Sequence, residues 1–158
     1  MAIQRSKYGT LVALHPQATV AQLLAELVPP REFESATFVN YVPHSEYPSQ
    51  AQVQLAAQLF ARGTVAKKFF GKSASLPPGI YLDGGFGVGK THLLAAVWHE
   101  FKGRKAFGSF ISYTSLIGAL GFTEAVHALA KFELICIDEF ELDDPGDTMM
   151  MSRLLNEL

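Results

Sequence analysis

Apolar side chains recur three and four residues apart near the start of the chain. Between residues 20 and 27 this spacing predicts a first helix. Thr19 and Gln22 form a T-x-x-Q capping box at its beginning, and Pro29 and Pro30 end it.

A second helix is predicted to begin near Ser49, where Gln52 completes another capping box. Its apolar pattern weakens near Gly63 and resumes over residues 65–70. The segment 33–50 between the two helices is rich in aromatic, proline and polar residues. It is predicted to be irregular and to cover part of the core, because its aromatic side chains would not all stay in water.

Strands alternate with helices from residue 79 onward. Apolar, β-rich runs predict strands over residues 79–83, 107–114 and 133–138. Helices are predicted over residues 92–101, over 115–121, over 123–132 with Thr123 as a cap, and after Asp144, with Pro145 at the first helical position. This alternation predicts an α/β class with a parallel sheet and crossovers.

A glycine-rich segment lies between the predicted strand at 79–83 and the helix that follows. Residues 84–91, GGFGVGKT, fit the Walker A pattern G-x-x-x-x-G-K-S/T in the required strand–loop–helix context. Backbone N–H groups of such a loop surround phosphates, Lys90 supplies a charge to the β and γ phosphates, and Thr91 offers a hydroxyl to Mg²⁺. The predicted ATP-binding residues are Gly84, Gly85, Phe86, Gly87, Val88, Gly89, Lys90, Thr91 and His92.

The alternative is a glycine-rich turn that matches the pattern by accident. Average residue usage makes an accidental match in a chain of this length roughly one in two hundred, which favours the phosphate loop. The neighbouring His92 has a second interpretation, as a structural residue on the helix beside the loop.

An acidic pair ends the apolar run LICIDE over residues 134–139. In a Walker B strand, Asp138 would hold Mg²⁺ through its water shell, together with Thr91. Glu139 would accept a proton from the water that attacks the γ-phosphate, or orient that water. The predicted cofactors are ATP and Mg²⁺. The sequence contains no guanine-reading motif of GTPases.

Composition and charge exclude several other classes. Hydrophobic residues make up 49% and the formal net charge is −2, which describes a packed globular chain without the basic field of many nucleic-acid binders. Cys136 is the single cysteine, so an intramolecular disulfide is excluded. No apolar run is long enough for a membrane span, and residues 1–14 have no secretory pattern, so we predict a cytoplasmic protein.

Three stretches of the chain resemble the ZapE-type cell-division ATPases, a branch of the AAA+ superfamily with mitochondrial relatives. They are YLDGGFGVGKTHLLAAVWH, FISYTSLIGALGF and LICIDEFELDDPGDTMMMSRLL, and the upstream ATFVNYVPHSEYPSQAQ is similar as well. The resemblance runs from about residue 30 to the end of the sequence. It implies a P-loop NTPase of AAA+ type with a three-layer αβα parallel sheet, ATP hydrolysis, and an oligomeric ring of identical subunits.

Further implications concern partners and domain organisation. Bacterial members of the family are linked to the division ring through FtsZ, and mitochondrial members to protein quality control. Residues 1–48 would form a lead-in that covers the nucleotide site, and residues 49–158 a partial ATPase core. Candidate adenine contacts are Phe38, Tyr41, Val42 and Gln50, with simple capping of the core as the alternative for these aromatic residues.

The resemblance also implies that the core is incomplete at its C-terminal end. Of five strands in the spatial order 5-1-4-3-2, only strands 1, 2 and 3 are recognisable, and the missing fourth strand would lie between the phosphate-loop strand and the Asp138 strand. We therefore expect weak ATP binding by this polypeptide and no turnover at a useful rate. Phe122, beside Gly121, matches an aromatic–glycine pore loop, but packing in the core is the favoured interpretation.

Two other functions stay open at this point. A helicase-loader-like ATPase that acts on DNA carries a similar phosphate loop, although the absence of a basic surface argues against nucleic acid as a partner. A nucleotide-binding regulatory module without turnover is disfavoured by the presence of both Lys90 and Glu139. Stimulation of hydrolysis by DNA would favour the loader, and effects that depend on FtsZ would favour the cell-division ATPase.

Overall fold

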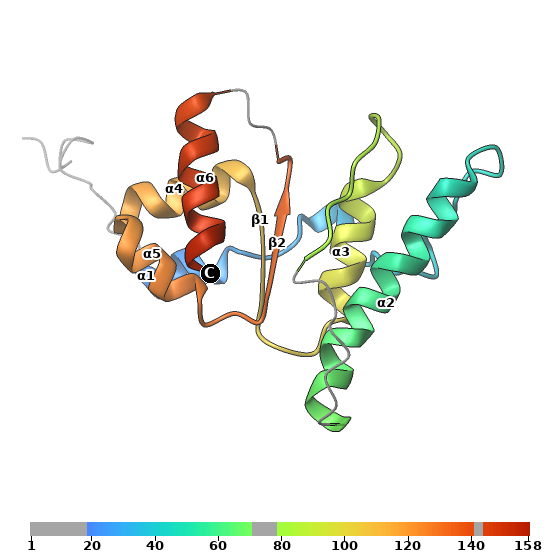
Figure 1. Cartoon of the computed structure of the whole chain (residues 1–158), viewed down its shortest axis with the longest axis horizontal. Helices are drawn as coiled ribbons and strands as arrows, with labels where there is room; N and C mark the ends of the chain where they lie inside the picture. The colour runs from blue at the N-terminus through green and yellow to red at the C-terminus, as the bar shows by residue number, and fades with distance from the viewer. Residues whose placement is uncertain (1–18, 71–78, 141–143) are drawn as a thin grey trace, which may run out of the picture.

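The computed structural model describes residues 19–70, 79–140 and 144–158 (Figure 1). Residues 1–14, on which the prediction of no leader rests, lie outside this part. The elements in chain order are α1 (Val20–Ala25), the short 3₁₀ helix η2 (Arg31–Phe33), α2 (Pro48–Phe70), α3 (Lys90–Glu100), β1 (Lys105–Ser109), α4 (Phe110–Leu120), α5 (Phe122–Leu129), β2 (Leu134–Asp138) and α6 (Pro145–Glu157).

The two strands pair in parallel, as the alternation of strands and helices predicts. Lys105 lies opposite Leu134, and Ser109 lies opposite Asp138, so both strands end at the same edge. The helices α4 and α5 make the crossover between them. The described part of the chain thus combines helices with a small parallel sheet, which confirms the α/β class in part.

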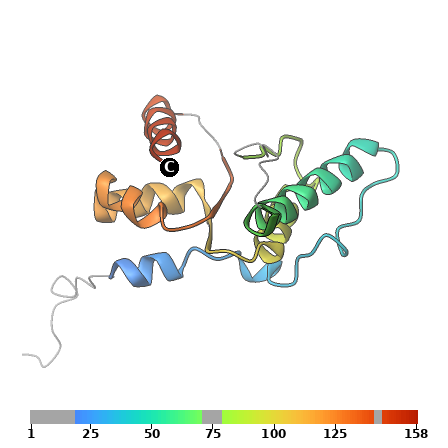
Figure 2. The same cartoon turned by 60° about the horizontal axis from the view of Figure 1, so that its bottom comes forward.

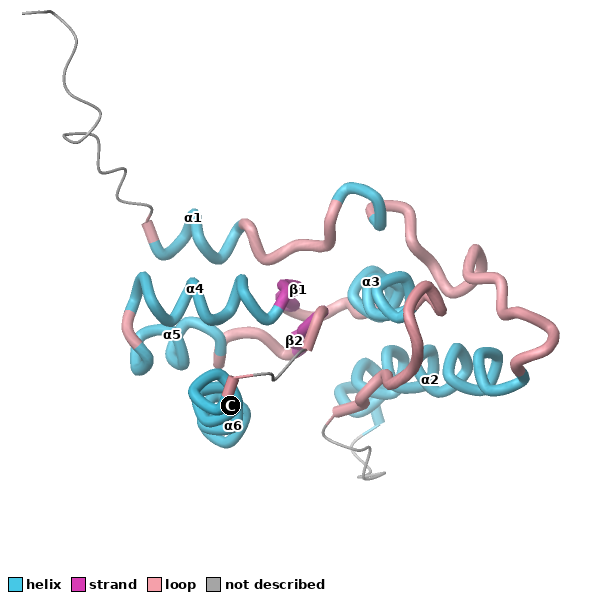
Figure 3. Tube along the Cα trace, turned by 90° about the horizontal axis from the view of Figure 1, so that it is seen from above, coloured by secondary structure: helices cyan, strands magenta, loops and turns pink. Residues whose placement is uncertain are grey.

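This sheet lies between α2 and α3 on one side and α4, α5 and α6 on the other (Figure 3), and each side has its own group of buried side chains. Leu134 and Cys136 of β2 pack on one face with residues of α2 and α3. Ile135 and Ile137 pack on the other face against α4, α5 and α6. Side chains alternate between the two faces of a strand, so a single five-residue strand reaches both groups.

The outer edge of β1 is covered by the chain that follows α1. The Phe107 N–H donates to the Leu27 carbonyl oxygen at 3.0 Å, and Leu27 is buried with the α4–α6 group. Figure 2 shows α1 beside α4 and α5. The first helix therefore packs against the same group of buried side chains as α4, α5 and α6.

The predicted strand over residues 79–83 is wrong. Residues 79–85 form no regular element, and the sheet of the described residues contains β1 and β2 alone. A strand exists only where a neighbour takes up its backbone hydrogen bonds. The β-rich composition of GIYLD cannot supply that neighbour by itself.

The strand predicted over residues 107–114 ends earlier than expected. The side chain of Ser109 accepts a hydrogen bond from the Ser112 N–H at 3.2 Å and caps α4, which begins at the next residue. A serine cap supplies one of the acceptors that a helix start needs, so the chain turns helical there.

Two predicted helix caps are wrong, although α2 starts within one residue of the predicted start near Ser49. The helix α2 begins at Pro48, so Ser49 lies inside its first turn, and the helix continues without a break through Gly63. Gly121, with φ of +78°, precedes α5, so Thr123 is already helical. In both cases the start of the helix is determined by a residue with unusual backbone preferences: Pro48 for α2 and Gly121 for α5.

Two other predicted caps are confirmed. Thr19 and Gln22 make the complete capping box of α1. Asp144 caps α6 by accepting from the Gly146 N–H at 2.7 Å, with Pro145 in the first turn.

Phe122 packs as a core residue in this structure. Its ring is half-buried against the α4–α6 group, and the Arg153 guanidinium carbon lies 4.1 Å from the ring centroid. The cation lies over the ring, an arrangement that stabilises a partly exposed aromatic side chain.

Candidate functional site

The glycine-rich segment leads directly into the first turn of α3. Gly87 and Gly89 have φ values of +73° and +86°, in the left-handed region that favours glycine. Lys90 is the first residue of α3. The loop therefore ends at a helix N-terminus, where unpaired N–H groups and the helix dipole attract anions.

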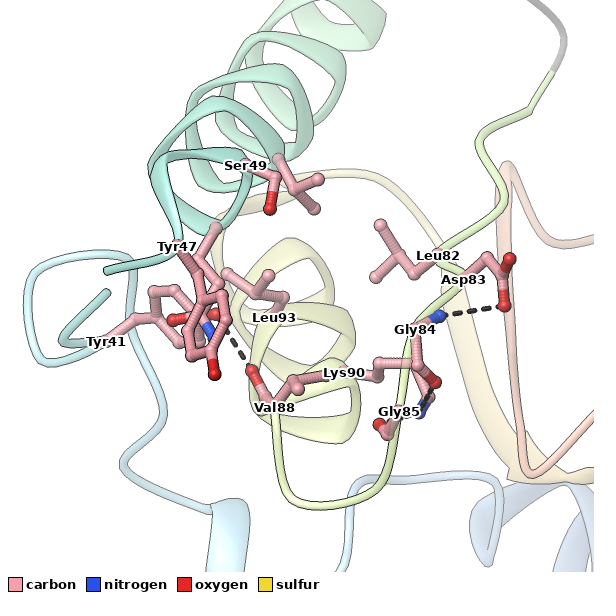
Figure 4. A pocket seen from close by; sticks show the side chains of 12 residues that line it. Tyr41, Tyr47, Ser49, Leu82, Asp83, Gly84, Gly85, Val88, Lys90 and Leu93 are labelled. Carbon is pink, nitrogen blue, oxygen red and sulfur yellow. Dashed lines mark hydrogen bonds between the residues drawn. The ribbon is translucent and has the colours of Figure 1, made fainter. Parts of the chain in front are cut away.

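Lys90 spans the loop from one end to the other (Figure 4). Its Nζ donates to the carbonyl oxygens of Gly84 at 2.7 Å and Gly85 at 2.8 Å. The ammonium group is thereby held at the loop by two backbone dipoles. A phosphate oxygen could replace these carbonyls as its partner, and a hydrogen bond between two charged groups is stronger than one to a neutral carbonyl.

The two residues predicted to hold Mg²⁺ lie next to each other. Thr91 Oγ1 donates to Asp138 Oδ1 at 3.1 Å, although the two residues are 47 positions apart in the sequence. A hydroxyl and a carboxylate are oxygen ligands of the kind that Mg²⁺ uses, with waters and phosphates in its remaining positions. Among the described residues, no group of three or more His, Cys, Asp and Glu side chains forms a metal site of its own.

Glu139 follows β2 directly and is exposed. Its φ is +50°, and it is the one residue other than glycine with positive φ in the described part of the chain. Left-handed backbone is uncommon for glutamate, and such conformations gather at functional sites. The unusual backbone occurs at the residue that the sequence predicts as the catalytic base.

A cavity of about 270 Å³ opens between the phosphate loop, the start of α2 and the lead-in (Figure 4). It is lined by Tyr41, Tyr47, Ser49, Gln50, Val53, Leu82, Asp83, Gly84, Gly85, Val88, Lys90 and Leu93. The lining is mainly apolar away from the loop and polar beside Lys90. This division suits a ligand with a flat ring at one end and phosphates at the other.

The four candidate adenine residues are found in different surroundings. Tyr41 and Gln50 line the cavity. Phe38 is buried in the core, and Val42 is 85% exposed; neither lines the cavity. Sequence reasoning missed Ser49 and Val53, whose spacing of four residues on one face of α2 could have indicated a shared orientation.

Two contacts attach the lead-in to the start of α3. The Tyr41 hydroxyl donates to the Val88 carbonyl oxygen at 2.9 Å. His92 Nε2 lies 3.0 Å from both the Thr37 carbonyl oxygen and Asn40 Oδ1. His92 therefore faces the lead-in, and it is not among the residues that line the cavity.

The buried titratable groups near the site stay in their neutral forms. Burial raises the pKa of Tyr41. Burial, followed by the charge of nearby Asp138, raises the pKa of Cys136 to about 12, against the opposing effect of Lys105. At neutral pH the Cys136 thiol is protonated and acts as a packing group.

Comparison with known proteins gives one match. A family model described as AFG1-like ATPase matches residues 17–158. No curated protein and no solved structure gives a significant match. None of the helices in the described ranges is both long and apolar enough to cross a bilayer.

Proposed function

The chain belongs to the AFG1-like ATPase family of the AAA+ superfamily, and we propose that it binds ATP with residues 84–91 and that Asp138 and Glu139 serve ATP hydrolysis. Membership of this family supports a P-loop NTPase fold and ATPase activity. The assignment of individual residues rests on the geometry around the phosphate loop.

The contact between Thr91 and Asp138 is the observation that carries the proposal. It joins the first turn after the phosphate loop to the end of β2, at 3.1 Å. Bound Mg²⁺ would neutralise phosphate charge at this point. Thr91 and Asp138 would hold it, with Thr91 turning its hydroxyl oxygen from Asp138 toward the cation.

Lys90 and Glu139 have the two remaining roles. Lys90 would exchange the carbonyls of Gly84 and Gly85 for oxygens of the β and γ phosphates. Glu139, exposed at the end of β2, would orient a water molecule and take up its proton. The apolar part of the cavity, with Tyr41 and Gln50, would receive the adenine.

The wider biological role follows from the family resemblance. We propose a self-associating ring that acts in the cytoplasm and takes part in bacterial cell division through FtsZ. The division of the chain into a lead-in of residues 1–48 and a core from residue 49 belongs to the same proposal. DNA-stimulated hydrolysis would instead favour a helicase-loader function.

The proposal is tested by titrating a fluorescent ATP analogue, with and without Mg²⁺, against the parent chain and Lys90→Ala. Loss of a hydrogen bond from a charged group costs about 1.5–3 kcal/mol of binding free energy. The affinity of Lys90→Ala for the analogue should therefore be at least about tenfold lower than that of the parent chain. Lys131→Ala, which removes an exposed lysine from the loop after α5, is the matched control and should bind as the parent does. Unchanged affinity in Lys90→Ala contradicts the assignment of the phosphate loop.

Glu139→Gln separates binding from hydrolysis. It keeps the shape of the side chain but loses the proton acceptor, so binding should persist in the same titration. A phosphate-release assay should show turnover slowed by about 10²–10⁴-fold wherever the parent hydrolyses ATP. We expect little turnover by this polypeptide, because residues 79–85 have no hydrogen bond to β2, and a small displacement of Glu139 from the phosphates lowers the rate steeply.

A further inference from the structure

The phosphate loop is held from outside by a tyrosine of the lead-in. The Tyr41 hydroxyl donates to the Val88 carbonyl oxygen at 2.9 Å, and 8% of the Tyr41 residue is exposed (Figure 4). The ring also lies against the next residue: a Cβ added to Gly89 would be 2.6 Å from Tyr41 Cε2. The tyrosine thus contacts both residues that the Val88–Gly89 peptide bond joins.

This contact fixes the direction of one peptide plane. In a trans peptide the carbonyl and the following N–H point to opposite sides. With the Val88 carbonyl held by Tyr41, the Gly89 N–H points away from Tyr41. Gly89 belongs to the predicted phosphate-binding amides, so its orientation matters for a bound phosphate.

The segment that carries Tyr41 is itself a closely hydrogen-bonded turn. Asn40 Oδ1 accepts from the Thr37 N–H at 2.7 Å, and Asn40 Nδ2 donates to the Ser35 carbonyl oxygen at 2.8 Å. His92 Nε2 lies at 3.0 Å from two acceptors of this turn, which requires the proton on Nε2. Residues 35–41, the lead-in turn, are therefore attached at two points: Tyr41 bonds to the phosphate loop, and His92 bonds to the turn from the first turn of α3.

We propose that Tyr41 is a positioning residue that holds the Val88–Gly89 peptide in its phosphate-binding orientation, and that the lead-in turn and the phosphate loop respond to nucleotide together. This inference rests on the proposed function of the loop. Since a coupling between two segments is reciprocal, nucleotide at the loop stabilises the lead-in turn as much as the turn stabilises the occupied loop.

Tyr41→Phe tests the proposal, because it removes the hydroxyl and keeps the ring. Tyr81→Phe is the matched control: Tyr81 is 72% exposed, does not line the cavity, and its hydroxyl has no hydrogen bond within the described ranges. Hydrogen–deuterium exchange of residues 84–91 without nucleotide should be about fivefold faster in Tyr41→Phe, the equivalent of one neutral hydrogen bond, and unchanged in Tyr81→Phe.

Nucleotide supplies the second measurement. Affinity for the fluorescent ATP analogue should fall by up to about fivefold in Tyr41→Phe, and the analogue should protect residues 35–41 from exchange less than in the parent chain. The proposal would be overturned if Tyr41→Phe exchanged residues 84–91 at the parental rate and bound the analogue with the parental affinity. If the parent chain binds no nucleotide, the proposed function fails by itself, and faster exchange of the loop in Tyr41→Phe would still identify Tyr41 as its support.

Discussion

Replacement of Gly89 by alanine probes why this position is glycine. Its φ of +86° costs alanine about 1–2 kcal/mol. The new Cβ would also lie 2.6 Å from Tyr41 Cε2. The ring is buried and its hydroxyl is bonded to Val88, so it cannot swing aside without losing that bond, and overpacking of this kind costs about 1–3 kcal/mol more.

A double-mutant cycle separates the two contributions. Tyr41→Leu keeps an apolar side chain but removes the atoms beyond Cδ, and with them the contact at 2.6 Å. Gly89→Ala should lower the free energy of unfolding by about 3 kcal/mol in the parent chain and by about 1–2 kcal/mol in Tyr41→Leu. The coupling between the two positions is then about 1–2 kcal/mol.

Urea denaturation followed by circular dichroism measures all four chains of the cycle. The dependence of the unfolding free energy on urea concentration should be equal among them, so that a shift of the midpoint reports stability. An equal effect of Gly89→Ala in both backgrounds would refute the reasoning. The left-handed backbone at position 89 would then be the whole reason that this position requires glycine, and the Tyr41 ring would contribute nothing.

Two further outcomes follow from buried groups away from the loop. Burial raises the pKa of Cys136 from 9.0 to about 12, so the unfolded chain loses this proton first. The contribution of this thiol to stability should be constant below about pH 9 and fall toward pH 12 by at most about 1.4 kcal/mol per pH unit. Cys136→Ala should make this alkaline slope shallower in urea titrations, and an equal slope would exclude the thiol as one of its sources. Tyr113 and Tyr41, whose pKa values burial also raises, contribute to the slope that is left. Phe122→Ala should lower the unfolding free energy by about 2 kcal/mol, since the ring is half-buried under Arg153. Phe86→Ala, at a phenylalanine that is 99% exposed, is the control, and equal stability of both variants would return Phe122 to the pore hypothesis.

Local signals in the sequence predicted several elements around the candidate site that the structure shows. The capping box at Thr19 and the proline signal after Asp144 depend on neighbouring residues alone, and the structure confirms both. The glycine-rich loop before α3 likewise shows its positive φ values where the motif predicts a tight turn. The capping error at Ser49 is also local, because Pro48 starts the helix one residue earlier.

The sequence by itself determined the family, which the family model confirms, and it predicted the roles of the loop and the acidic pair, because motif spacing is a property of neighbouring residues. Tertiary structure decided the rest. Within the described ranges, the β-rich run 79–83 pairs with no strand and forms none, because a ladder needs a partner. The contact between Thr91 and Asp138, and the tyrosine that holds Val88, each span 47 positions of the chain. Contacts between residues so far apart depend on how α3, β2 and the lead-in pack together, which local spacing does not encode.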